Sequence, residues 1–244
     1  MADRGHMQQF WDERAREDAF FFVDNRLEYR NPDVESFWAE GESDLAALLT
    51  LVGAAIRPQD TVVDIGCGVG RLTRAIAAQE ATVLAVDVSR EMLDRARELN
   101  AHVEDVTWVH GDGTSLAQIA DATADACVSH VVFQHIPDPH VTLGYVREIG
   151  RVLRPGGWAA FQVSNDPSVH RARRLGARDR LAVAVGRRPR GSADPAWLGS
   201  AIDLPQLREV AAASGLDVER VVGEGTQFCY ILLRRRPDDH RVVG

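Results

Sequence analysis

The stretch VVDIGCGVGRLT, residues 62–73, joins an apolar run to a turn that contains three glycines. The β-branched residues before the turn are typical of a buried strand, and Arg-Leu-Thr after it begins a helical pattern. Glycines at such a turn let bare backbone N–H groups approach a ligand at the N-terminus of the following helix. The stretch therefore predicts a nucleotide-binding turn in an α/β sheet.

The spacing of the glycines indicates which nucleotide fits. A dinucleotide fingerprint has the pattern G-x-G-x-x-G, whereas residues 66–70 read G-x-G-x-G and Arg71 stands where the third glycine belongs. The Arg71 side chain would crowd a pyrophosphate. Asp64, two residues before the turn, adds a carboxylate that disfavours phosphate and favours a cationic ligand. On charge, the turn suits a nucleoside with an amino-acid cation and a sulfonium better than it suits NAD.

Strands and helices alternate around this turn. The strands are apolar enough to need covering on both faces, which predicts a parallel sheet of βαβ units. The predicted strands are residues 61–66, 82–88, 106–112, 126–133, 156–164, 217–224 and 227–235. The predicted helices are residues 71–79, 89–100, a short one at 115–119, one after Pro139, and 204–214. Ser89 and Asp203 are predicted helix caps, Gly215 a predicted helix stop, and the turn LRPGGW precedes the fifth strand.

The two flanking regions have their own patterns. Residues 6–56 predict helices, with Ser43 as the cap of one that ends before Pro58. The alternation breaks at residues 165–200, where eight arginines lie between Arg171 and Arg190. These arginines are open to three interpretations: binding of an acidic acceptor, contact with a partner or neighbouring subunit, or a solvated face.

Composition excludes several classes of function. The net charge is −8 over 244 residues, which disfavours nucleic acid and anionic membranes as main partners. All 28 positive charges are arginine, so Schiff-base, P-loop and kinase-type lysines are excluded. Three cysteines form no disulfide framework, and Cys127 and Cys229 lie in apolar runs as predicted core residues. The charged N-terminus and the lack of an apolar run of membrane length predict a cytoplasmic protein without a membrane partner.

Five motifs in the same order resemble one family. VVDIGCGVGRLT resembles the D/E-x-G-x-G-x-G motif of class I S-adenosylmethionine (SAM)-dependent methyltransferases of the small-molecule type. VLAVDVSREML, GDGTSL, DACVSHVVFQHIPDP and VLRPGGW are similar to the family's later motifs. The resemblance spans about residues 60–164. It implies an α/β fold with a seven-stranded, mostly parallel Rossmann-like sheet between helices, an N-terminal helical lid, and a cap insertion after the fifth strand.

The resemblance also implies a cofactor and its site. SAM is the expected methyl donor and S-adenosyl-L-homocysteine the product. Asp64 and the glycines lie at the methionine end, Asp87 at the ribose hydroxyls, and Asp112 at the adenine, against which Met92 packs. The full set of expected cofactor-binding residues is Asp64, Gly66, Cys67, Gly68, Gly70, Arg71, Asp87, Val88, Met92, Asp112, Gly113, Thr114, Ser129 and His130.

The methyl acceptor leaves fewer signals. His130 and His135 follow the fourth strand, at the sheet edge where open α/β sheets bind ligands, and His135 is the better candidate for a general base. A purely structural role stays open for each histidine. Eight of the 16 aromatic residues lie in the first 38 positions, and among them Trp11 and Tyr29 are expected to contact ligand, with Gln134 on the acceptor side. The acid cluster of metal-dependent catechol enzymes is absent, so no metal is expected.

These observations predict one methyltransferase domain over residues 1–244. Its parts are a helical lid at 1–56, a SAM-binding core at 57–164, a cap insertion at 165–200, a C-terminal helix and two strands at 201–236, and a tail at 237–244. The expected reaction moves a methyl group from SAM to an oxygen or nitrogen of a small molecule. A non-methylating SAM-binding protein, an RNA or protein methyltransferase and an NAD(P) oxidoreductase stay open as alternatives, as does a homodimer.

Overall fold

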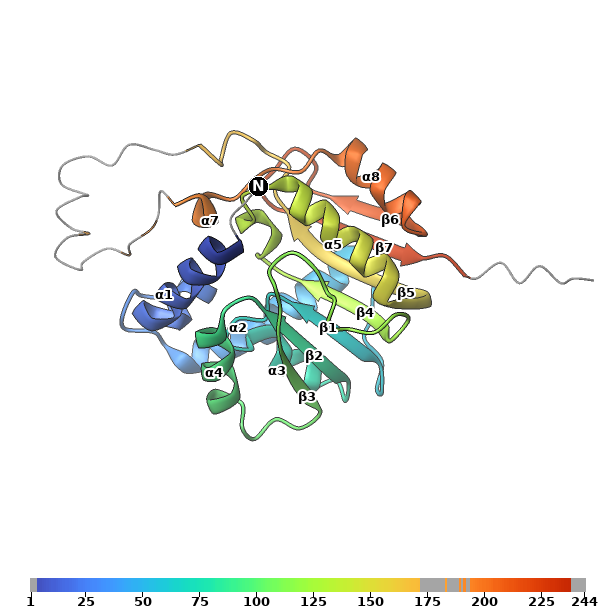
Figure 1. Ribbon diagram of the computed structural model, residues 1–244. Coiled ribbons are helices and arrows are strands. Elements are labelled where there is room, and N and C mark those ends of the chain that lie inside the picture. Colours follow the sequence, from blue (N-terminus) through green and yellow to red (C-terminus); the bar gives the residue numbers. More distant parts are fainter. Residues whose placement is uncertain (1–3, 172–182, 184–188, 190, 192–193, 238–244) are drawn as a thin grey trace, which may run out of the picture.

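The computed structural model describes residues 4–171, 183, 189, 191 and 194–237. A seven-stranded sheet with the order β3-β2-β1-β4-β5-β7-β6 runs through it (Figure 1). The strands are β1 (Thr61–Ile65), β2 (Thr82–Asp87), β3 (Val106–His110), β4 (Ala124–Ser129), β5 (Leu153–Val163), β6 (Leu216–Val222) and β7 (Cys229–Arg235). The first five are parallel and β7 is antiparallel to both of its neighbours, so the expected Rossmann-like sheet is confirmed.

The direction of winding reverses at β1. From β1 the chain proceeds outward through β2 and β3, then returns to place β4 on the other side of β1. Such a switch point leaves a crevice outside the carboxyl ends of the central strands. In register, Ile65 lies opposite Val86 of β2, and Asp64 lies opposite Val128 of β4. The glycine turn, residue 87 and residue 130 are therefore brought to one edge.

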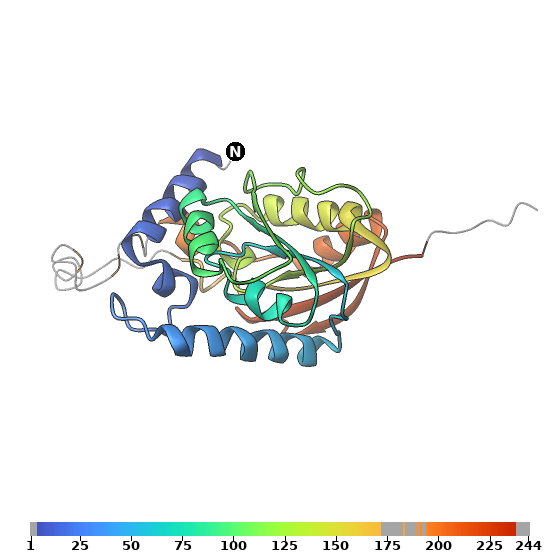
Figure 2. The same cartoon turned by 90° about the horizontal axis from the view of Figure 1, so that it is seen from below.

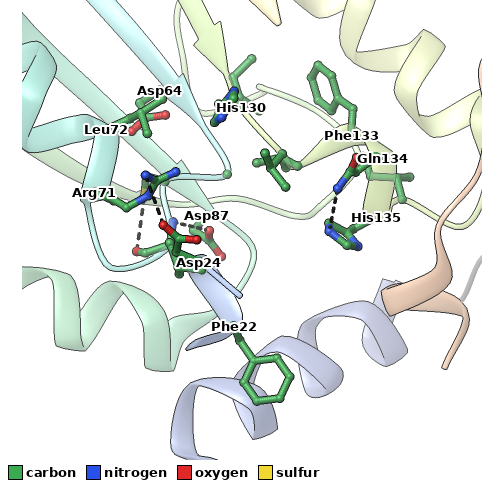
Figure 3. A pocket seen from close by; sticks show the side chains of 18 of the residues that line it. Phe22, Asp24, Asp64, Arg71, Leu72, Asp87, His130, Phe133, Gln134 and His135 are labelled. Atoms are coloured by element: carbon green, nitrogen blue, oxygen red, sulfur yellow. Dashed lines mark hydrogen bonds and ion pairs between the residues drawn. The ribbon is translucent and has the colours of Figure 1, made fainter. Parts of the chain in front are cut away.

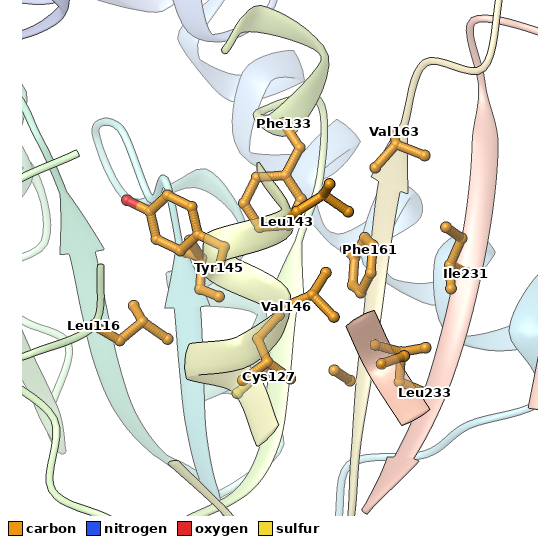
Figure 4. Close-up of a cluster of buried hydrophobic side chains, with 14 of the residues drawn as sticks. Leu116, Cys127, Phe133, Leu143, Tyr145, Val146, Phe161, Val163, Ile231 and Leu233 are labelled. Carbon is orange, nitrogen blue, oxygen red and sulfur yellow. The ribbon is translucent and has the colours of Figure 1, made fainter. Parts of the chain in front are cut away.

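Helices cover both faces of the sheet. They are α1 (Arg4–Val23), α2 (Val34–Val52), α3 (Arg71–Ala77), α4 (Arg90–Leu99), α5 (Pro139–Val152), α7 (Pro195–Leu198) and α8 (Leu204–Ala213), with a 3-10 turn η1 (Phe133–His135) after β4. Figure 2 shows α2 along one face and α5 along the other. Side chains of α2 and α3 form one buried cluster with the sheet, and those of α5 and α8 form the other. Phe133, Leu143 and Phe161 are fully buried in the second cluster (Figure 4).

Local signals identified several element ends correctly. The Ser89 hydroxyl accepts a hydrogen bond from the Met92 amide (3.1 Å) and caps α4. The Asp203 carboxylate accepts one from the Gln206 amide (2.9 Å) and caps α8. Gly215 follows α8 with a φ of 73°, in the left-handed region that ends helices.

The N-terminal prediction was wrong in its cap. The second helix begins at Val34, nine residues before Ser43, and Asp33 caps it by accepting from the Ser36 amide (3.1 Å). Ser43 lies within this helix. Buried Phe37 and Gly41 extend the apolar face upstream of the residues that suggested the shorter helix. Residues 24–33 form the connection between α1 and α2.

Two predictions on the core were also wrong. The short helix at 115–119 is a series of turns, because the Asp112 carboxylate takes the amides of Thr114 and Ser115 (both 2.8 Å) and the Glu148 carboxylate takes that of Leu116 (3.1 Å). The turn at 153–158 belongs to an irregular beginning of β5, where the register with β4 shifts between Ala124 and Ala126.

Some expectations fall outside what the structure describes. The arginine-rich segment between Arg171 and Arg190, the core of the expected cap, lies almost entirely outside the described residues, as does the tail from 238. Among the helices within the described ranges, none is long and apolar enough to cross a membrane. The same ranges hold no group of three or more His, Cys, Asp or Glu side chains placed to hold a metal ion.

Candidate functional site

A cavity of about 660 Å³ lies at the carboxyl ends of β1, β2 and β4. Its volume is within the usual range for ligand pockets, about 300–1,000 Å³. Side chains from α1 and α2, the glycine turn, the loop after β4, and β7 contribute to its lining. Figure 3 shows Asp24, Asp64, Arg71 and Asp87 gathered near one end of the cavity, with Gln134 and His135 on the opposite side.

The glycine turn fits closely around its neighbours. Gly66 and Gly68 line the cavity with φ of 77° and 55°, a backbone conformation that residues other than glycine rarely adopt. A Cβ on Gly66 would overlap the Val132 side chain, and one on Gly68 would lie 2.7 Å from Val23 Cγ2. Cys67, between them, also lines the cavity. Gly70 instead precedes α3 as its N-cap, outside the lining, and a Cβ there would meet Trp108 and Asn100.

Two of the three expected carboxylates line the cavity. Asp64 is buried and accepts a hydrogen bond from the Thr73 hydroxyl (2.6 Å), and burial raises its pKa to about 6. Asp87 accepts from the amides of Gly68 and Ser89 (both 2.8 Å), and burial also raises the pKa of its carboxyl. Burial outweighs the opposing effects of Arg71 on Asp64 and of His110 on Asp87, so both positions favour a positively charged or hydroxyl-bearing ligand.

The third carboxylate, Asp112, lies beside the lining. Its oxygens hold the backbone at residues 114 and 115, and these hydrogen bonds lower the pKa of the carboxyl despite the opposing effect of burial. Gly113, next to it, does line the cavity, as do Val88 and Met92. Thr114 and Ser129 lie outside the lining, and the Ser129 hydroxyl donates to the Ile65 carbonyl (2.9 Å).

An ion-pair network that sequence reasoning missed crosses the cavity wall. Arg71 is buried and pairs with Asp44 of α2 (2.6 Å) and, at 3.7 Å, with Asp24. Arg26 pairs with the same two carboxylates, with Asp24 at 2.6 Å and with Asp44 at 2.8 Å. Hydrogen bonds from these arginines lower the pKa values of Asp24 and Asp44 against the opposing effect of burial. The network joins the α1–α2 connection to the first residue of α3.

The two candidate histidines differ in their hydrogen bonds. His135 Nδ1 lies 2.7 Å from the Trp197 carbonyl, and its Nε2 lies 3.2 Å from the Gln134 amide nitrogen. Both of its ring nitrogens are therefore occupied, and burial lowers its pKa to about 4. His130 lines the same cavity, and its Nδ1 is buried without a hydrogen-bond partner among the described residues. Its pKa is lowered to about 4, chiefly by burial.

Aromatic residues of the N-terminal segment divide into two groups. Trp11 lines the cavity together with Phe22, and its ring contacts His135 (5.8 Å between centroids). Tyr29 lies outside the lining, where its hydroxyl donates to Glu17. Phe22 also contacts Trp197 (5.6 Å), so α1 and the segment around α7 meet above the loop after β4.

Comparisons with known proteins agree with this geometry. Residues 63–161 match the family described as "Methyltransferase domain". A ubiquinone biosynthesis O-methyltransferase of Thiobacillus denitrificans is 29% identical over 169 residues, covering 66% of each chain. A trans-aconitate 2-methyltransferase of Azoarcus sp. is 38% identical over 135 residues, covering 54% of this chain and 48% of the relative. This chain thus spans from about half to two thirds of these curated relatives.

Solved structures share the fold. Haemonchus contortus phosphoethanolamine N-methyltransferase 1, in complex with phosphoethanolamine and S-adenosylhomocysteine, has a TM-score of 0.68 at 18% identity, covering 97% of this chain and 50% of that one. A putative methyltransferase of Haloferax volcanii, in complex with its Trm112 activator, has a TM-score of 0.62 at 21% identity, covering 93% and 97%. The family match runs over the residues that build the glycine turn and the strands beside it, so residues 63–161 are similar to a methyltransferase domain, and the relatives and the shared fold support the class I SAM-dependent methyltransferase family.

Proposed function

We propose that this chain transfers a methyl group from SAM to an oxygen or nitrogen atom of a small molecule. The observation that carries the proposal is the lining of the cavity, because besides the glycine turn and the ends of β1 and β2 it includes a second region of residues from α2 and from 227–230. One region suits a nucleoside and the other suits an acceptor. A cavity that held only a cofactor would need no second region.

The cofactor end is built from the glycine turn and the ends of β2 and β3. The carboxylate of Asp87 in the lining supports a contact with ribose hydroxyls, and Gly111, Gly113 and Met92 in the same lining support a contact with a flat base. Asp64 and Arg71 supply opposite charges for the ammonium and carboxylate of an amino acid. SAM bound there would supply a methyl group on a sulfonium, and its in-line transfer would release a neutral thioether. The residues of this chain position the acceptor behind that methyl group and exclude water.

The acceptor end has apolar walls and one polar corner. Ala47, Leu48 and Leu51 of α2 line it together with Phe228 and Tyr230, and Leu51 and Phe228 are exposed at 37% and 52%. Asp44 and His130 form the polar corner. Such a chamber supports an acceptor with an apolar or aromatic body and one polar reacting atom. One relative is a ubiquinone biosynthesis O-methyltransferase, which supports oxygen as that atom.

Calorimetry and a turnover panel test the proposal. We expect the purified chain to bind both SAM and S-adenosylhomocysteine and to form the latter when supplied with phenols, carboxylic acids or amines. Failure to bind either nucleoside would overturn it. Tight binding with no turnover over the whole panel would favour a SAM-binding protein without transferase activity, and RNA or protein binding that weakens steeply with salt would favour a macromolecular acceptor. A homodimer and a cytoplasmic location stay predictions of the sequence.

A further inference from the structure

The cavity opens to solvent at the acceptor end. Among the described residues of its lining, the exposed ones are Asn25, Arg26, Ala47, Leu51 and Phe228. The lining residues of the glycine turn and of the ends of β1 and β2 are all buried or half-buried. Asn25 and Arg26 are polar and belong to the α1–α2 connection. The other three exposed residues are apolar, and we call Ala47, Leu51 and Phe228 the apolar mouth.

The apolar mouth concentrates a feature that is rare elsewhere on the molecule. Within the described part of the chain, the exposed large apolar side chains are Val34, Leu51, Val169 and Phe228, and Leu51 and Phe228 belong to the mouth. Single exposed apolar residues are ordinary, whereas apolar surface that continues from a cavity marks the path of a ligand. The mouth is therefore the part of the lining that water covers and that an apolar occupant would cover instead.

The loop between β6 and β7 holds Phe228 in this exposed position. The Phe228 amide donates to Thr226 Oγ1 (3.2 Å), and that hydroxyl donates to the Gly223 carbonyl (2.7 Å). Asn165, two residues after β5, accepts from the Gly225 amide (2.8 Å), and its own backbone amide donates to the Thr226 carbonyl (2.8 Å). The aromatic ring thus projects from a loop that is tied to itself and to the end of β5.

Helix α2 presents a stripe of residues that leads to the mouth. Asp44, Ala47, Leu48 and Leu51 recur at helical spacing, and all of them line the cavity. Asp44 pairs with Arg71 (2.6 Å), the first residue of α3 after the glycine turn. Leu51 lies two turns farther along the helix, about 10 Å away at 1.5 Å per residue. The wall therefore changes from charged beside the glycine turn to apolar at the mouth.

The first residues of β7 lie beside this stripe. Helix α2 packs against β6 and β7. Tyr230 packs on the buried cluster that contains Leu48, and its ring stacks on His130 at 6.2 Å. His130 Nε2 in turn is 3.8 Å from Asp44 Oδ2. Phe228, two positions before Tyr230, lines the same cavity, so a molecule that lies along the stripe is also within reach of this strand end.

We propose that the methyl acceptor is an amphiphile whose polar reacting end lies toward the glycine turn and whose hydrocarbon tail runs along α2 and leaves through the apolar mouth. The inference rests on the proposed function and names the substrate class of its acceptor end. A compact acceptor enclosed beside the glycine turn would leave Leu51 and Phe228 in water, whereas a tail covers both. These two residues are therefore specificity-determining, and they act on binding because no bond forms or breaks at the mouth.

Calorimetry with homologous series of amphiphiles tests the inference without a known acceptor. The probes are alkylphenols, alkanoic acids and alkylamines with tails of increasing length, each titrated into the chain saturated with S-adenosylhomocysteine. In at least one series we expect Kd to fall about two- to threefold per added methylene, somewhat less than the factor of about four for a fully buried methylene. Affinity that does not depend on tail length in any series would overturn the inference.

Variants of the mouth locate the effect. Phe228→Ser and Leu51→Ser should each weaken the dependence of Kd on tail length and leave the affinity for S-adenosylhomocysteine unchanged. Val34→Ser is the matched control, because Val34 is 40% exposed on the same helix but lies outside the cavity lining. Phe228→Leu should retain most of the dependence, since leucine keeps an apolar side chain at the mouth. An equal loss in Val34→Ser would show that the tails bind elsewhere and would refute the inference.

Sedimentation distinguishes a tail from a second copy of the chain as the occupant. We expect Phe228→Ser to leave the sedimentation coefficient unchanged. A dimer that dissociates in Phe228→Ser, together with probe affinities that ignore tail length in the unaltered chain, would make the mouth a subunit interface and would overturn the inference.

Turnover separates this inference from the proposed function. With an acceptor found in the panel, a longer tail should lower KM with little change in kcat, because contacts at the mouth are the same in the ground state and the transition state. Phe228→Ser should raise KM for long-tailed acceptors and leave it unchanged for short ones. Normal turnover with a KM that ignores the tail would refute the inference and leave methyl transfer intact. Tail-dependent binding without any turnover would refute the proposed function, while the mouth would stand as a site for tails.

Discussion

Gly41 and Gly144 are both helical glycines, and their replacement by alanine should have opposite effects on stability. In α2, a Cβ on Gly41 would lie 2.7 Å from the Arg71 carbonyl oxygen and 2.8 Å from Arg71 Cγ. In α5, a Cβ on Gly144 would meet only the Thr114 carbonyl oxygen, at an ordinary 3.7 Å. Alanine is favoured over glycine within a helix by about 1 kcal/mol in either place. That gain is common to both variants and cancels in the comparison.

The difference between the two variants isolates the steric penalty. Overpacking against a backbone atom costs about 1–3 kcal/mol, so Gly41→Ala should be less stable than Gly144→Ala by about that amount. Urea unfolding followed by circular dichroism gives the two free energies of unfolding at equal slope. We expect Gly144→Ala to unfold at higher urea than the unaltered chain and Gly41→Ala at lower urea. Equal stabilisation of both would refute the close approach of α2 to the beginning of α3.

Three further predictions concern the site and the core. Asp87→Asn should weaken S-adenosylhomocysteine binding by about 1–3 kcal/mol in calorimetry, because a charged hydrogen-bond acceptor is lost. Asp94→Asn, at an exposed position of α4, is the control and should leave the affinity unchanged. Equal affinities of the two variants would exclude Asp87 from the site. The pKa of Asp64 in the folded protein is about 6, above its ordinary 3.8. The ionised carboxylate therefore destabilises the fold above pH 6, and this destabilisation decreases as the pH falls from 6 to 3.8. Asp64→Asn should therefore raise the urea midpoint more near pH 7.5 than near pH 4.5, and a pH-independent difference would contradict the assignment. Phe161→Ala should lower the free energy of unfolding by about 3–5 kcal/mol, and a small effect in the same urea assay would mean that the second buried cluster is loosely packed.

The sequence was most informative where a local pattern decides local structure. The serine before α4 and the aspartate before α8 cap their helices as expected, since a short polar side chain can reach the amides of its own first turn. The prediction failed where distant residues decide. The sequence around Leu116 has a helical pattern. The Leu116 amide, however, donates to the Glu148 carboxylate, 32 positions later, and the short helix does not form. Ser43 is a good cap residue placed inside a helix that packing extends to Val34.

The same contrast applies to the candidate site. The glycine turn and the acids at the ends of β1 and β2 have motif spacing, so the sequence pointed to Gly66, Gly68, Asp64 and Asp87, which line the cavity. Asp44 has no such spacing. It faces Arg71, 27 positions away, only because α2 folds back against α3, and nothing in the neighbouring residues signals this. Which of the two histidines has a free ring nitrogen also depends on partners remote in the chain, such as the Trp197 carbonyl beside His135.

Helix α1 has a consequence for the order in which the molecule assembles. Part of its packing depends on residues distant in the sequence, because Phe22 packs on Trp197 and His6 lies 3.0 Å from Asp194, a separation of 188 positions. The helix also contacts α2 through Phe20 and Phe37, and α4 through Asp12 and Ser89, but its contacts at Phe22 and His6 need residues 194–197 as well. Contacts between parts of a chain so far apart in sequence form slowly, so the wall over the crevice, and with it the ability to enclose a ligand, depends on slow long-range docking.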